Sequence, residues 1–298
     1  MDKYDLLVIG GGAAGMAAAL TAAQDGRRVL LAERSGRLGG VLPQCLHQGF
    51  GLSYFHQDLT GAAYAERFIR RLAAAPVEVR LGTMVVELTA ERTAWLSSEA
   101  GFWQVGFAQA ILASGCREIP LGALPIAGTR PSGIFTAGQA QQMVNLYGYD
   151  IGDEVVILGS GDIGLIMAQQ LSRLGKQVRA IIEQKDHLGG LPEHQERCQR
   201  GWRIPVITSA TIGEIHGQQR LSGVTVCHKD GRRDYLPCST LIVAVGLLPE
   251  RELAAPLAID GGYPDWLALC GNCDYVHKIV DTVTIQAEKT AAALKPAK

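Results

Sequence analysis

The chain has 298 residues, of which 47% are hydrophobic and 19% charged, and its net charge is −1. This composition is typical of a globular α/β protein and leaves room for two domains. Because no basic stripe is visible, the charge pattern argues against nucleic-acid binding. The acidic residues 1–5 do not resemble a signal peptide, and no stretch predicts a transmembrane helix. We therefore expect a cytoplasmic protein without direct membrane insertion.

The first predicted unit begins with a strand at 4–9, a helix at 13–25 and a strand at 28–33. The turn into the helix carries a glycine-rich fingerprint, Gly10-Gly11-Gly12-Ala13-Ala14-Gly15, and Glu33 ends the second strand. The first glycine permits the tight turn, the second lets the backbone approach a pyrophosphate, and the third lets the helix pack closely on the sheet. The Glu33 carboxylate can accept hydrogen bonds from an adenosine ribose. A single motif of this kind is weak evidence, because such a turn can also form without a ligand.

The chain then continues through a loop, a helix and several short strands. Residues 34–58 are rich in Gly, Gln and His and predict a loop. Tyr64, Phe68 and Leu72 recur at four-residue spacing, which predicts a helix over 60–75. Strands are predicted at 77–81, 84–89, 93–98, 102–108 and 110–115.

A second unit is predicted after a Pro/Gly-rich linker at 120–131. Its fingerprint is Gly159-Ser160-Gly161-Asp162-Ile163-Gly164, and Glu183 follows at a distance similar to that of Glu33 from the first fingerprint. The remaining predicted elements are helices at 137–147, 162–174, near 193–199 and over 274–294, and strands at 154–158, 177–182, 204–207, 221–228, 233–237 and 241–246.

Two complete fingerprints, each inside a strand–helix–strand unit, predict two dinucleotides on one chain. That pair is expected of a flavin enzyme that exchanges hydride with a nicotinamide nucleotide. The Glu183 carboxylate would repel a 2′-phosphate, and Gln184-Lys185-Asp186 after it contains no arginine pair. NADH is therefore favoured over NADPH. The positive charge of Lys185 is the one feature that opposes this preference.

With both fingerprints, Gly39-Gly40, Ala113-Ser114-Gly115 and Ala244-Val245-Gly246, the chain resembles the pyridine nucleotide–disulfide oxidoreductase superfamily in its two-domain, thioredoxin-reductase-like layout. The resemblance implies an α/β fold of two Rossmann-like domains, the second inserted into the first. It implies an FAD-binding domain at 1–117 and 247–298 and an NAD(P)H-binding domain at 118–246.

The resemblance also implies the residues of each site. For FAD these are Gly10, Gly12, Ala13, Ala14, Gly15, Glu33, Arg34, Gly39, Gly40, Val85, Ala113, Ser114, Gly115, Gly271, Asn272, His277 and Val280. For the nicotinamide nucleotide they are Gly159, Gly161, Asp162, Ile163, Glu183, Gln184 and Gly246.

A narrower resemblance rests on residues 38–51, 133–139 and 157–167, on Cys270-Gly271-Asn272 and on Val276-His277. These segments are similar to bacterial NAD(P)/FAD-dependent oxidoreductases that are typically encoded beside a glycerol-3-phosphate-dehydrogenase-like flavoprotein. They are also similar to nucleotide-binding subunits of amine and amino-acid dehydrogenases. The resemblance implies a partner flavoprotein or dehydrogenase subunit, and it leaves a homodimer open.

The chain departs from the superfamily in three places. Asn272 stands where the superfamily has an aspartate, the stretch between Glu250 and Gly271 is shortened, and the redox cysteine pair is missing from both usual positions. An asparagine can still donate a hydrogen bond to a flavin oxygen. The missing pair argues against a dithiol relay.

Seven irregularly spaced cysteines favour reduced thiols over a disulfide scaffold. In the loop that the resemblance places near the flavin, Cys45 could act as a peroxidatic thiol and His47 as a proton donor, although ordinary packing is the favoured interpretation. Cys270 and Cys273 form a Cys-x-x-Cys that we interpret as packing, and with His277 they fall short of a zinc site, so no metal is expected. His277 could instead provide positive charge near the flavin or cap a helix.

Two alternatives to a partner-linked NADH oxidoreductase remain at this stage. One is a thioredoxin-reductase-like disulfide reductase or NADH oxidase/peroxidase that uses Cys45 or Cys270 and Cys273. The other is a non-catalytic nucleotide-binding subunit. Hydride transfer between cofactors needs no protein acid or base, so no catalytic triad is expected, and none is found.

Overall fold

The computed structural model of the chain describes residues 1–294. The chain divides into two compact units, one formed by Met1–Arg117 together with the segment from Leu248 onward, the other by Glu118–Leu247. The second unit is thus a continuous insertion between two segments of the first. The predicted boundary differs at Leu247, which lies in the second unit.

The first unit is built on a mixed seven-stranded sheet. Its strand order is β3-β2-β1-β6-β5-β4, and β18 also pairs with β6. The β1–β2, β2–β3, β1–β6 and β6–β18 pairs are parallel, whereas β4–β5 and β5–β6 are antiparallel. The bounds are β1 Asp2–Ile9, β2 Val29–Ala32, β3 Val77–Arg80, β4 Met84–Leu88, β5 Thr93–Ser98, β6 Gly101–Leu112 and β18 Leu267–Leu269.

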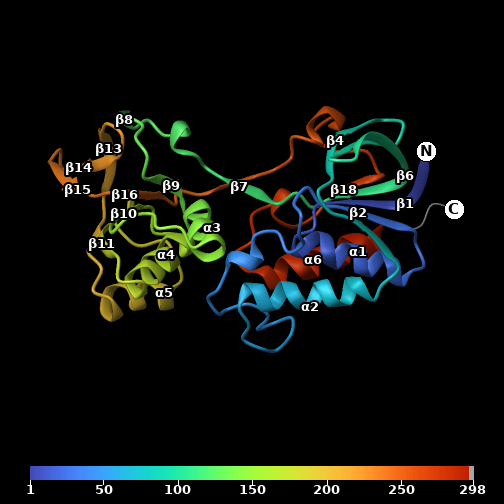
Figure 1. Cartoon of the computed structure of the whole chain (residues 1–298), viewed down its shortest axis with the longest axis horizontal. Helices are drawn as coiled ribbons and strands as arrows, with labels where there is room; N and C mark the ends of the chain where they lie inside the picture. The colour runs from blue at the N-terminus through green and yellow to red at the C-terminus, as the bar shows by residue number, and fades with distance from the viewer. Residues whose placement is uncertain (295–298) are drawn as a thin grey trace. The chain divides into compact units, whose positions relative to one another are not determined.

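Three helices pack together in the first unit, and Figure 1 shows them beneath the strands. They are α1 Ala13–Gln24, α2 Gly61–Ala73 and α6 Val280–Ala293. Most of α1 is buried, since both α2 and α6 contact it, and its alanine-rich sequence permits this close approach. Helix α2 begins after Thr60, whose side chain accepts a hydrogen bond from Ala63 N.

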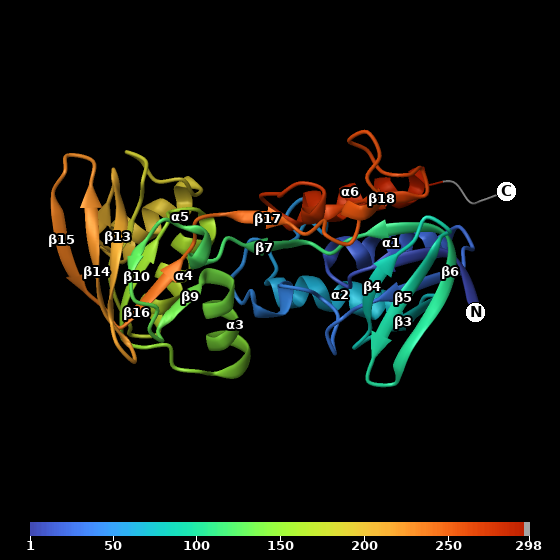
Figure 2. The ribbon, with the colours of Figure 1, turned by 90° about the horizontal axis from the view of Figure 1, so that it is seen from above.

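The second unit contains an all-parallel sheet of order β12-β11-β10-β16-β9 and a separate sheet of order β15-β14-β13-β8. Figure 2 shows β13, β14 and β15 as a neighbouring set of strands. The strand bounds are β8 Ala127–Gly128, β9 Ile134–Thr136, β10 Glu154–Leu158, β11 Gln177–Ile182, β12 Val206–Ile207, β13 Ala210–Gly217, β14 Leu221–His228, β15 Arg233–Pro237 and β16 Thr240–Val243.

The helices of this unit are α3 Ala137–Tyr147, α4 Asp162–Arg173 and α5 Pro192–Glu196, and α5 continues as a π-helical turn over Arg197–Gly201. The two segments that join the units, β7 Cys116–Glu118 and β17 Leu247–Pro249, pair with each other. Short 3₁₀ turns occupy Leu42–Gln44, Leu121–Ala123, Ala255–Leu257 and Gly271–Cys273.

The predicted fold class is confirmed: this is an α/β protein with two Rossmann-type units, the second inserted into the first. Several local predictions were wrong. The two strands predicted at 102–108 and 110–115 are one strand, β6. The predicted linker at 120–131 belongs to the second unit, where β8 pairs with β13. The last helix begins only at Val280, and strands β13 and β18 were not predicted.

Across residues 1–294, every helix is too short or too polar to cross a bilayer.

Candidate nucleotide sites

The turn between β1 and α1 requires glycine at two positions for reasons internal to the fold. Gly10 has a φ angle of +105°, and a Cβ there would lie 2.5 Å from the carbonyl oxygen of Ala113. A Cβ at Gly15 would overlap the carbonyl oxygen of Gly10. These two glycines let α1 approach β1 and β6 closely.

Gly12 differs from these two glycines, because neither its backbone nor its packing requires glycine. Its φ angle is −76°, which any residue adopts. Among the described residues, the only atom within 4 Å of a Cβ at Gly12 would be the Gly40 Cα, at 4.0 Å. Gly12 precedes α1, and within residues 1–294 no side chain caps this helix start. The open space and the first-turn amides suit an approaching phosphate group.

The Glu33 carboxylate is fixed at the end of β2. It accepts hydrogen bonds from Gly11 N at 2.6 Å and from Ser35 N at 2.7 Å, and Glu33 is 7% exposed. Arg34, predicted to help hold FAD, is exposed beside it. The acid and the glycine turn are therefore joined by a direct hydrogen bond.

The second fingerprint repeats this arrangement. Gly159 has a φ angle of +103°, and a Cβ there would overlap the carbonyl oxygen of Ala244. A Cβ at Gly164 would overlap the carbonyl oxygen of Gly159. Gly161, in contrast, has a φ angle of −63°, and a Cβ there would meet no atom of the described residues within 4 Å.

The Glu183 carboxylate accepts three hydrogen bonds, from Ser160 N at 3.0 Å, Ser160 Oγ at 2.5 Å and Lys185 N at 2.9 Å. Burial alone would raise the pKa of this carboxyl. The hydrogen bonds from Lys185 N and Ser160, together with the Lys185 charge, outweigh burial and hold the pKa below its ordinary value. Gln184 is exposed, Ile163 packs on the core of this unit, and Asp162 Oδ1 accepts from Leu191 N at 2.7 Å.

The structure brings other predicted flavin residues to the first fingerprint. Gly39 N donates to Gly11 O at 2.8 Å, and a Cβ at Gly40 would lie 3.1 Å from Gly12 Cα. A Cβ at Gly271 would lie 2.7 Å from the Ala14 Cβ. Segments 39–40 and 271–272 therefore both lie against the turn that starts α1.

Two of the predicted site segments follow strands directly: residues 113–115 come after β6, and Gly246 comes shortly after β16. Ala113 N donates to Ile9 O at 2.8 Å, Ser114 Oγ donates to Glu250 O at 2.6 Å, and Gly115 O accepts from Glu250 N at 3.0 Å. Val85 is buried in β4. In the second unit, Gly246 has a φ angle of +129°.

Around Asn272, side chains form a connected polar network. Asn272 Oδ1 accepts from His277 N at 3.0 Å, and Gln286 Oε1 accepts from Gly271 N at 2.8 Å. The His277 ring contacts Gln286 Oε1 and Thr282 Oγ1, both at 2.9 Å. Val280 begins α6 beside this network. His277 therefore contacts two side chains of α6, and within residues 1–294 no side-chain hydrogen bond caps the start of this helix.

Cys45 and His47 lie apart from the fingerprint contacts just described. Cys45 packs against Gly61 at the start of α2, is 8% exposed, and donates from Sγ to Val41 O at 3.5 Å. Burial raises the pKa of this thiol to about 12, which opposes the thiolate that a peroxidatic cysteine needs. The His47 ring lies 5.0 Å from the Phe50 ring, and its Nδ1 contacts Gln48 O at 2.8 Å.

Cys270 and Cys273 are both fully buried, and Cys273 Sγ donates to Leu112 O at 3.0 Å. Burial raises the pKa of each thiol. None of the seven cysteines, all of which lie within the described residues, forms a disulfide. Within residues 1–294, no group of three or more His, Cys, Asp and Glu side chains is placed to hold a metal ion.

Sequence reasoning missed three features of these sites. Leu188-Gly189-Gly190 repeats the Leu38-Gly39-Gly40 sequence, and Gly189 N donates to Ser160 Oγ at 2.9 Å. Asp281, 3% exposed, accepts backbone hydrogen bonds from Gly51, Ser53 and Tyr54. Gln286 joins the network described above. Only the repeated Leu-Gly-Gly could have been found from sequence alone.

This fold and these paired turns define a class, the flavoprotein oxidoreductases with Rossmann-type nucleotide-binding units. Residues 4–264 match the Pyridine nucleotide-disulphide oxidoreductase family, and the chain belongs to that family.

The curated relatives include the alpha subunit of sarcosine oxidase from Rhizobium meliloti (strain 1021), 28% identical over 89% of this chain and 26% of that protein. They also include the HcnB subunit of hydrogen cyanide synthase from Pseudomonas protegens, 27% identical over 87% of this chain and 60% of that protein. The chain thus spans less than two thirds of each of these relatives. Among solved structures, T. acidophilum thioredoxin reductase matches 99% of this chain and 98% of its own, with a TM-score of 0.82 and 19% identity.

Proposed function

We propose that the chain is an FAD-dependent NAD(P)H oxidoreductase that exchanges hydride between NADH and bound FAD. When bound, the flavin and the nicotinamide supply the hydride chemistry, and the protein supplies binding, orientation and electrostatics. FAD is assigned to the first unit and the nicotinamide nucleotide to the second. NADH is the preferred nucleotide, because the Glu183 carboxylate would repel a 2′-phosphate.

The observation that carries this proposal is the pair Gly12 and Gly161. The fold itself explains Gly10, Gly15, Gly159 and Gly164 through positive φ angles or close packing. It does not explain Gly12 and Gly161, whose φ angles are ordinary and whose missing Cβ atoms would find room. Close approach of a phosphate to the backbone accounts for glycine at both positions.

The residues around each turn support the same assignment. In the first unit, the FAD residues are those of the fingerprint, Glu33, the segments 39–40 and 113–115, and Gly271-Asn272 near the start of α6. The Asn272 amide oxygen accepts from His277 N, and its nitrogen donates to Cys116 Sγ at 3.6 Å. We assign the second hydrogen on that nitrogen to the cofactor. In the second unit, the fingerprint and Glu183 bind the adenosine half of the nicotinamide nucleotide.

We further propose that electrons leave the flavin without a thiol pair and pass to, or arrive from, a partner dehydrogenase subunit. The buried Cys45, Cys270 and Cys273 thiols, whose pKa values are raised, support a route without thiolates. The relatives named as subunits of sarcosine oxidase and of hydrogen cyanide synthase support a partner chain. A glycerol-3-phosphate-dehydrogenase-like flavoprotein is the proposed partner, on the strength of the sequence resemblance.

The test is an anaerobic titration of the purified protein with NADH and then NADPH, followed through the visible flavin absorption. We expect NADH to bleach the bound flavin. Gly161→Ala should weaken NADH binding at least about tenfold, because its Cβ would occupy the phosphate approach. Gly12→Ala should instead lower flavin retention and leave fold stability unchanged.

A flavin that NADH does not bleach, either alone or with the partner, would contradict the proposed reaction and favour the non-catalytic subunit. NADH-dependent peroxide or disulfide reduction that is lost in Cys45→Ser or Cys270→Ser would favour the thiol alternatives.

A further inference from the structure

His277 forms no capping hydrogen bond at the start of α6, yet both nitrogens of its ring have a hydrogen-bond partner. Nδ1 lies 2.9 Å from Thr282 Oγ1, and Nε2 lies 2.9 Å from Gln286 Oε1. A neutral imidazole carries a hydrogen on one nitrogen only, so it donates one hydrogen bond and accepts the other. The remaining bonds of the two partners therefore decide how many protons the ring carries.

The Gln286 amide turns its oxygen toward the ring. Its Nε2 donates to Asp274 Oδ2 at 2.6 Å, and a carboxylate oxygen can accept from an amide nitrogen but not from an amide oxygen. Its Oε1 accepts from Gly271 N at 2.8 Å, and a backbone N–H can only donate. Both contacts require the same orientation of the amide. The Nε2 of His277 must therefore donate to Gln286 Oε1.

The Thr282 hydroxyl also has no hydrogen to offer the ring. Its one hydrogen is donated to the backbone oxygen of Ile279 at 2.8 Å, because a carbonyl oxygen can only accept. The lone pairs of Thr282 Oγ1 then face His277 Nδ1, so this ring nitrogen donates as well. Such an arrangement requires a hydrogen on both ring nitrogens, which makes the side chain a positively charged imidazolium.

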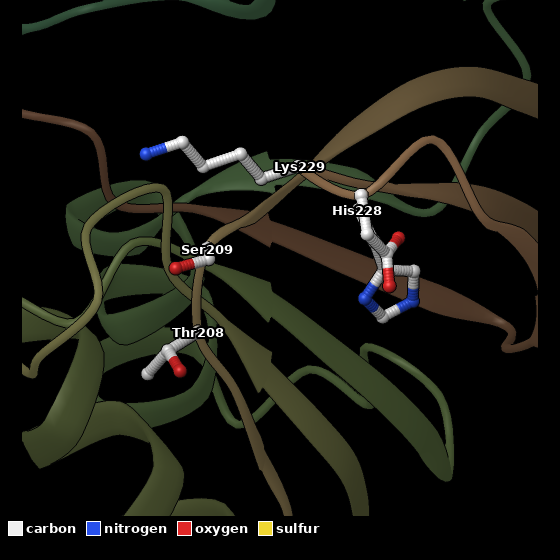
Figure 3. A pocket seen from close by; sticks show the side chains of 5 residues that line it. Thr208, Ser209, His228 and Lys229 are labelled. Atoms are coloured by element: carbon white, nitrogen blue, oxygen red, sulfur yellow. The ribbon is translucent and has the colours of Figure 1, made fainter.

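A second histidine has partners that require the neutral form. His228 lines a shallow hollow of the second unit, where Figure 3 shows its ring. Its Nε2 lies 2.8 Å from Asp234 Oδ2, and its Nδ1 lies 3.2 Å from Arg232 Nη2. A guanidinium can only donate, so Nδ1 of His228 accepts and the ring carries its one hydrogen on Nε2. His228 is therefore neutral beside a carboxylate, whereas His277 is charged between two neutral partners.

Two neighbours of the His277 ring favour its charged form. The Tyr275 ring stacks on it, with 4.1 Å between centroids and 25° between planes, and an aromatic face attracts a cation. The Asp274 carboxylate lies one hydrogen bond further away, beyond the Gln286 amide. Its negative charge therefore acts on the ring through one intervening side chain.

Other charged groups of this region have their own partners or face water. Arg251 donates to the backbone oxygen of Cys273 at 2.7 Å, and its charge opposes a second cation. Lys278 is exposed, so water and salt screen its ammonium. Asp281 accepts from three backbone amides of residues 51–54. The direction of the hydrogen bonds at the ring itself is therefore the strongest indication of its charge.

The charged ring lies beside a segment assigned to the flavin. The backbone N of His277 donates to Asn272 Oδ1 at 3.0 Å, and Gly271 N shares Gln286 Oε1 with the ring. A Cβ at Gly271 would lie 2.7 Å from the Ala14 Cβ, in the first turn of α1. The ring and residues 271–272 thus share hydrogen-bond partners next to the turn that is proposed to hold the cofactor.

We infer that His277 is held as an imidazolium and that its fixed positive charge favours the reduced form of the flavin. The second half rests on the proposed function, which assigns FAD to this unit. A hydride carries two electrons and one proton, so its transfer from NADH leaves NAD⁺ and gives the neutral flavin one negative charge. A cation beside the site stabilises that charge and raises the midpoint potential of the flavin.

The first measurement is nuclear magnetic resonance of the whole protein, labelled with ¹⁵N in its seven histidines. Long-range ¹H–¹⁵N correlation at about pH 7.5, where an ordinary histidine is mostly neutral, distinguishes a protonated from a bare ring nitrogen. The signals lost in His277→Gln and in His228→Gln assign the two rings. We expect two protonated nitrogens in His277 and one in His228. A bare Nδ1 in His277, with the Thr282 hydroxyl turned to donate to it, would overturn the inference.

The second measurement is the midpoint potential of the bound flavin, determined by equilibration with a redox dye. Because His277→Gln removes the charge, we expect it to lower the equilibrium constant for flavin reduction about tenfold, which is about 30 mV for a two-electron couple. His277→Lys keeps the charge and should restore most of this loss. His228→Gln, the same substitution in the second unit, is the matched control and should leave the potential unchanged.

The pH dependence of the potential separates an effect of charge from one of packing. The difference between the parent chain and His277→Gln should vanish at the pH at which the resonance spectrum shows the ring losing one proton. A difference that persists above that pH would overturn the effect of the charge on the flavin. So would equal potentials in the two proteins.

The proposed function can fail independently of this inference. A flavin whose potential falls in His277→Gln, but which NADH does not bleach, would contradict the proposed reaction and leave this inference standing. A protein that binds no flavin would contradict the FAD assignment and the second half of the inference together. The protonation of His277 can be measured in either case.

Discussion

The φ angles of Gly10 and Gly159 lie within two degrees of each other. In each turn, the amide of the next residue donates to the acid, from Gly11 N to Glu33 and from Ser160 N to Glu183. Their surroundings differ. In the first unit, α1 lies between α2 and α6, with an aromatic cluster of Tyr54, Phe55, Tyr64 and Phe68 nearby. In the second, α4 packs on an aliphatic core. The glycines and the acid thus define the turn, and different cores can support it.

The largest expected effect comes from adding a methyl group at the first glycine of each turn, where neither unit has room for it. Gly159→Ala places a Cβ against the Ala244 carbonyl oxygen at a positive φ angle, and Gly10→Ala does the same against Ala113. We expect each to lower the free energy of unfolding by about 3 kcal/mol or more. Urea unfolding followed by tryptophan fluorescence measures this, with Trp202 in the second unit and Trp95, Trp103 and Trp266 in the first.

Gly161→Ala is the matched control, because its Cβ meets no described atom within 4 Å. Its unfolding free energy should stay within about 0.5 kcal/mol of the parent chain. Equal losses for Gly159→Ala and Gly161→Ala would contradict the division of the glycines into fold-required and ligand-required positions.

Replacing each ribose acid should have a smaller effect, and the affected cofactor should differ between the two units. Glu183→Gln removes the charge that the ribose hydroxyls would meet, and we expect it to weaken NADH binding about tenfold. Glu33→Gln should lower flavin retention and leave NADH affinity unchanged once the flavin is restored. Calorimetric titration with NADH checks the first variant, and flavin content after gel filtration checks the second. Loss of NADH affinity in both would show that the two turns are not independent.

The pH dependence of Glu183→Gln follows from the lowered pKa of the Glu183 carboxyl. A depressed native pKa means that the ionised carboxylate stabilises the fold above its unfolded pKa, and that this contribution is lost as the pH falls through the native value. The stability difference between the parent chain and Glu183→Gln should therefore be constant at neutral pH and shrink below the ordinary pKa of 4.5. A stability difference that grows on acidification would contradict the lowered pKa of the Glu183 carboxyl.

A last comparison, which changes no residue, concerns the thiols of the two units. Burial raises the pKa of Cys45 in the first unit and of Cys238 in the second to about 12. At pH 8 we expect both to react with iodoacetamide at least about a hundredfold more slowly than in the unfolded chain, because the thiolate is the reactive form. Peptide mass spectrometry resolves the two sites. Rapid labelling of Cys45 alone would revive the peroxidatic alternative.

Much of the fold could be predicted because its strongest patterns are local. The strands and helices of both fingerprints lie within two residues of their predicted bounds at most ends, since glycines and apolar runs mark them clearly. Helix α2 was predicted from Tyr64, Phe68 and Leu72, which are all buried. Those signals depend on neighbouring residues in the chain and not on distant ones.

The missed elements depend on distant pairing. Strand β18 has only three residues and exists through its pairing with β6. A register shift between Ile212 and Glu214 interrupts the alternation of β13 and hides it from a period-two search. Strand β6 was divided at residue 109 because Gly106 and Gln109 interrupt its apolar run, yet β1 and β5 pair along it continuously.

The residues of the candidate sites also divide into those with a local sequence signal and those that depend on distant contacts. The glycines and the two acids could be predicted because the motif contains them. Asp281 and Gln286 could not, because each acts across more than ten residues of chain, on the loop at 51–54 and on Gly271 respectively. The roles of the predicted residues toward FAD and NADH remain proposals for the experiments above.

The insertion of one unit into the other affects how the protein is made. During translation, residues 118–247 emerge as one continuous stretch that contains all strands of the second unit, so this unit can fold while synthesis proceeds. The first unit must wait, because β18, which pairs with β6, and α6, which packs on α1, are synthesised after the second unit. Until then the apolar surface of α1 is exposed on the nascent chain. A chain truncated before residue 267 would keep that surface exposed and should be a target for chaperones and proteases.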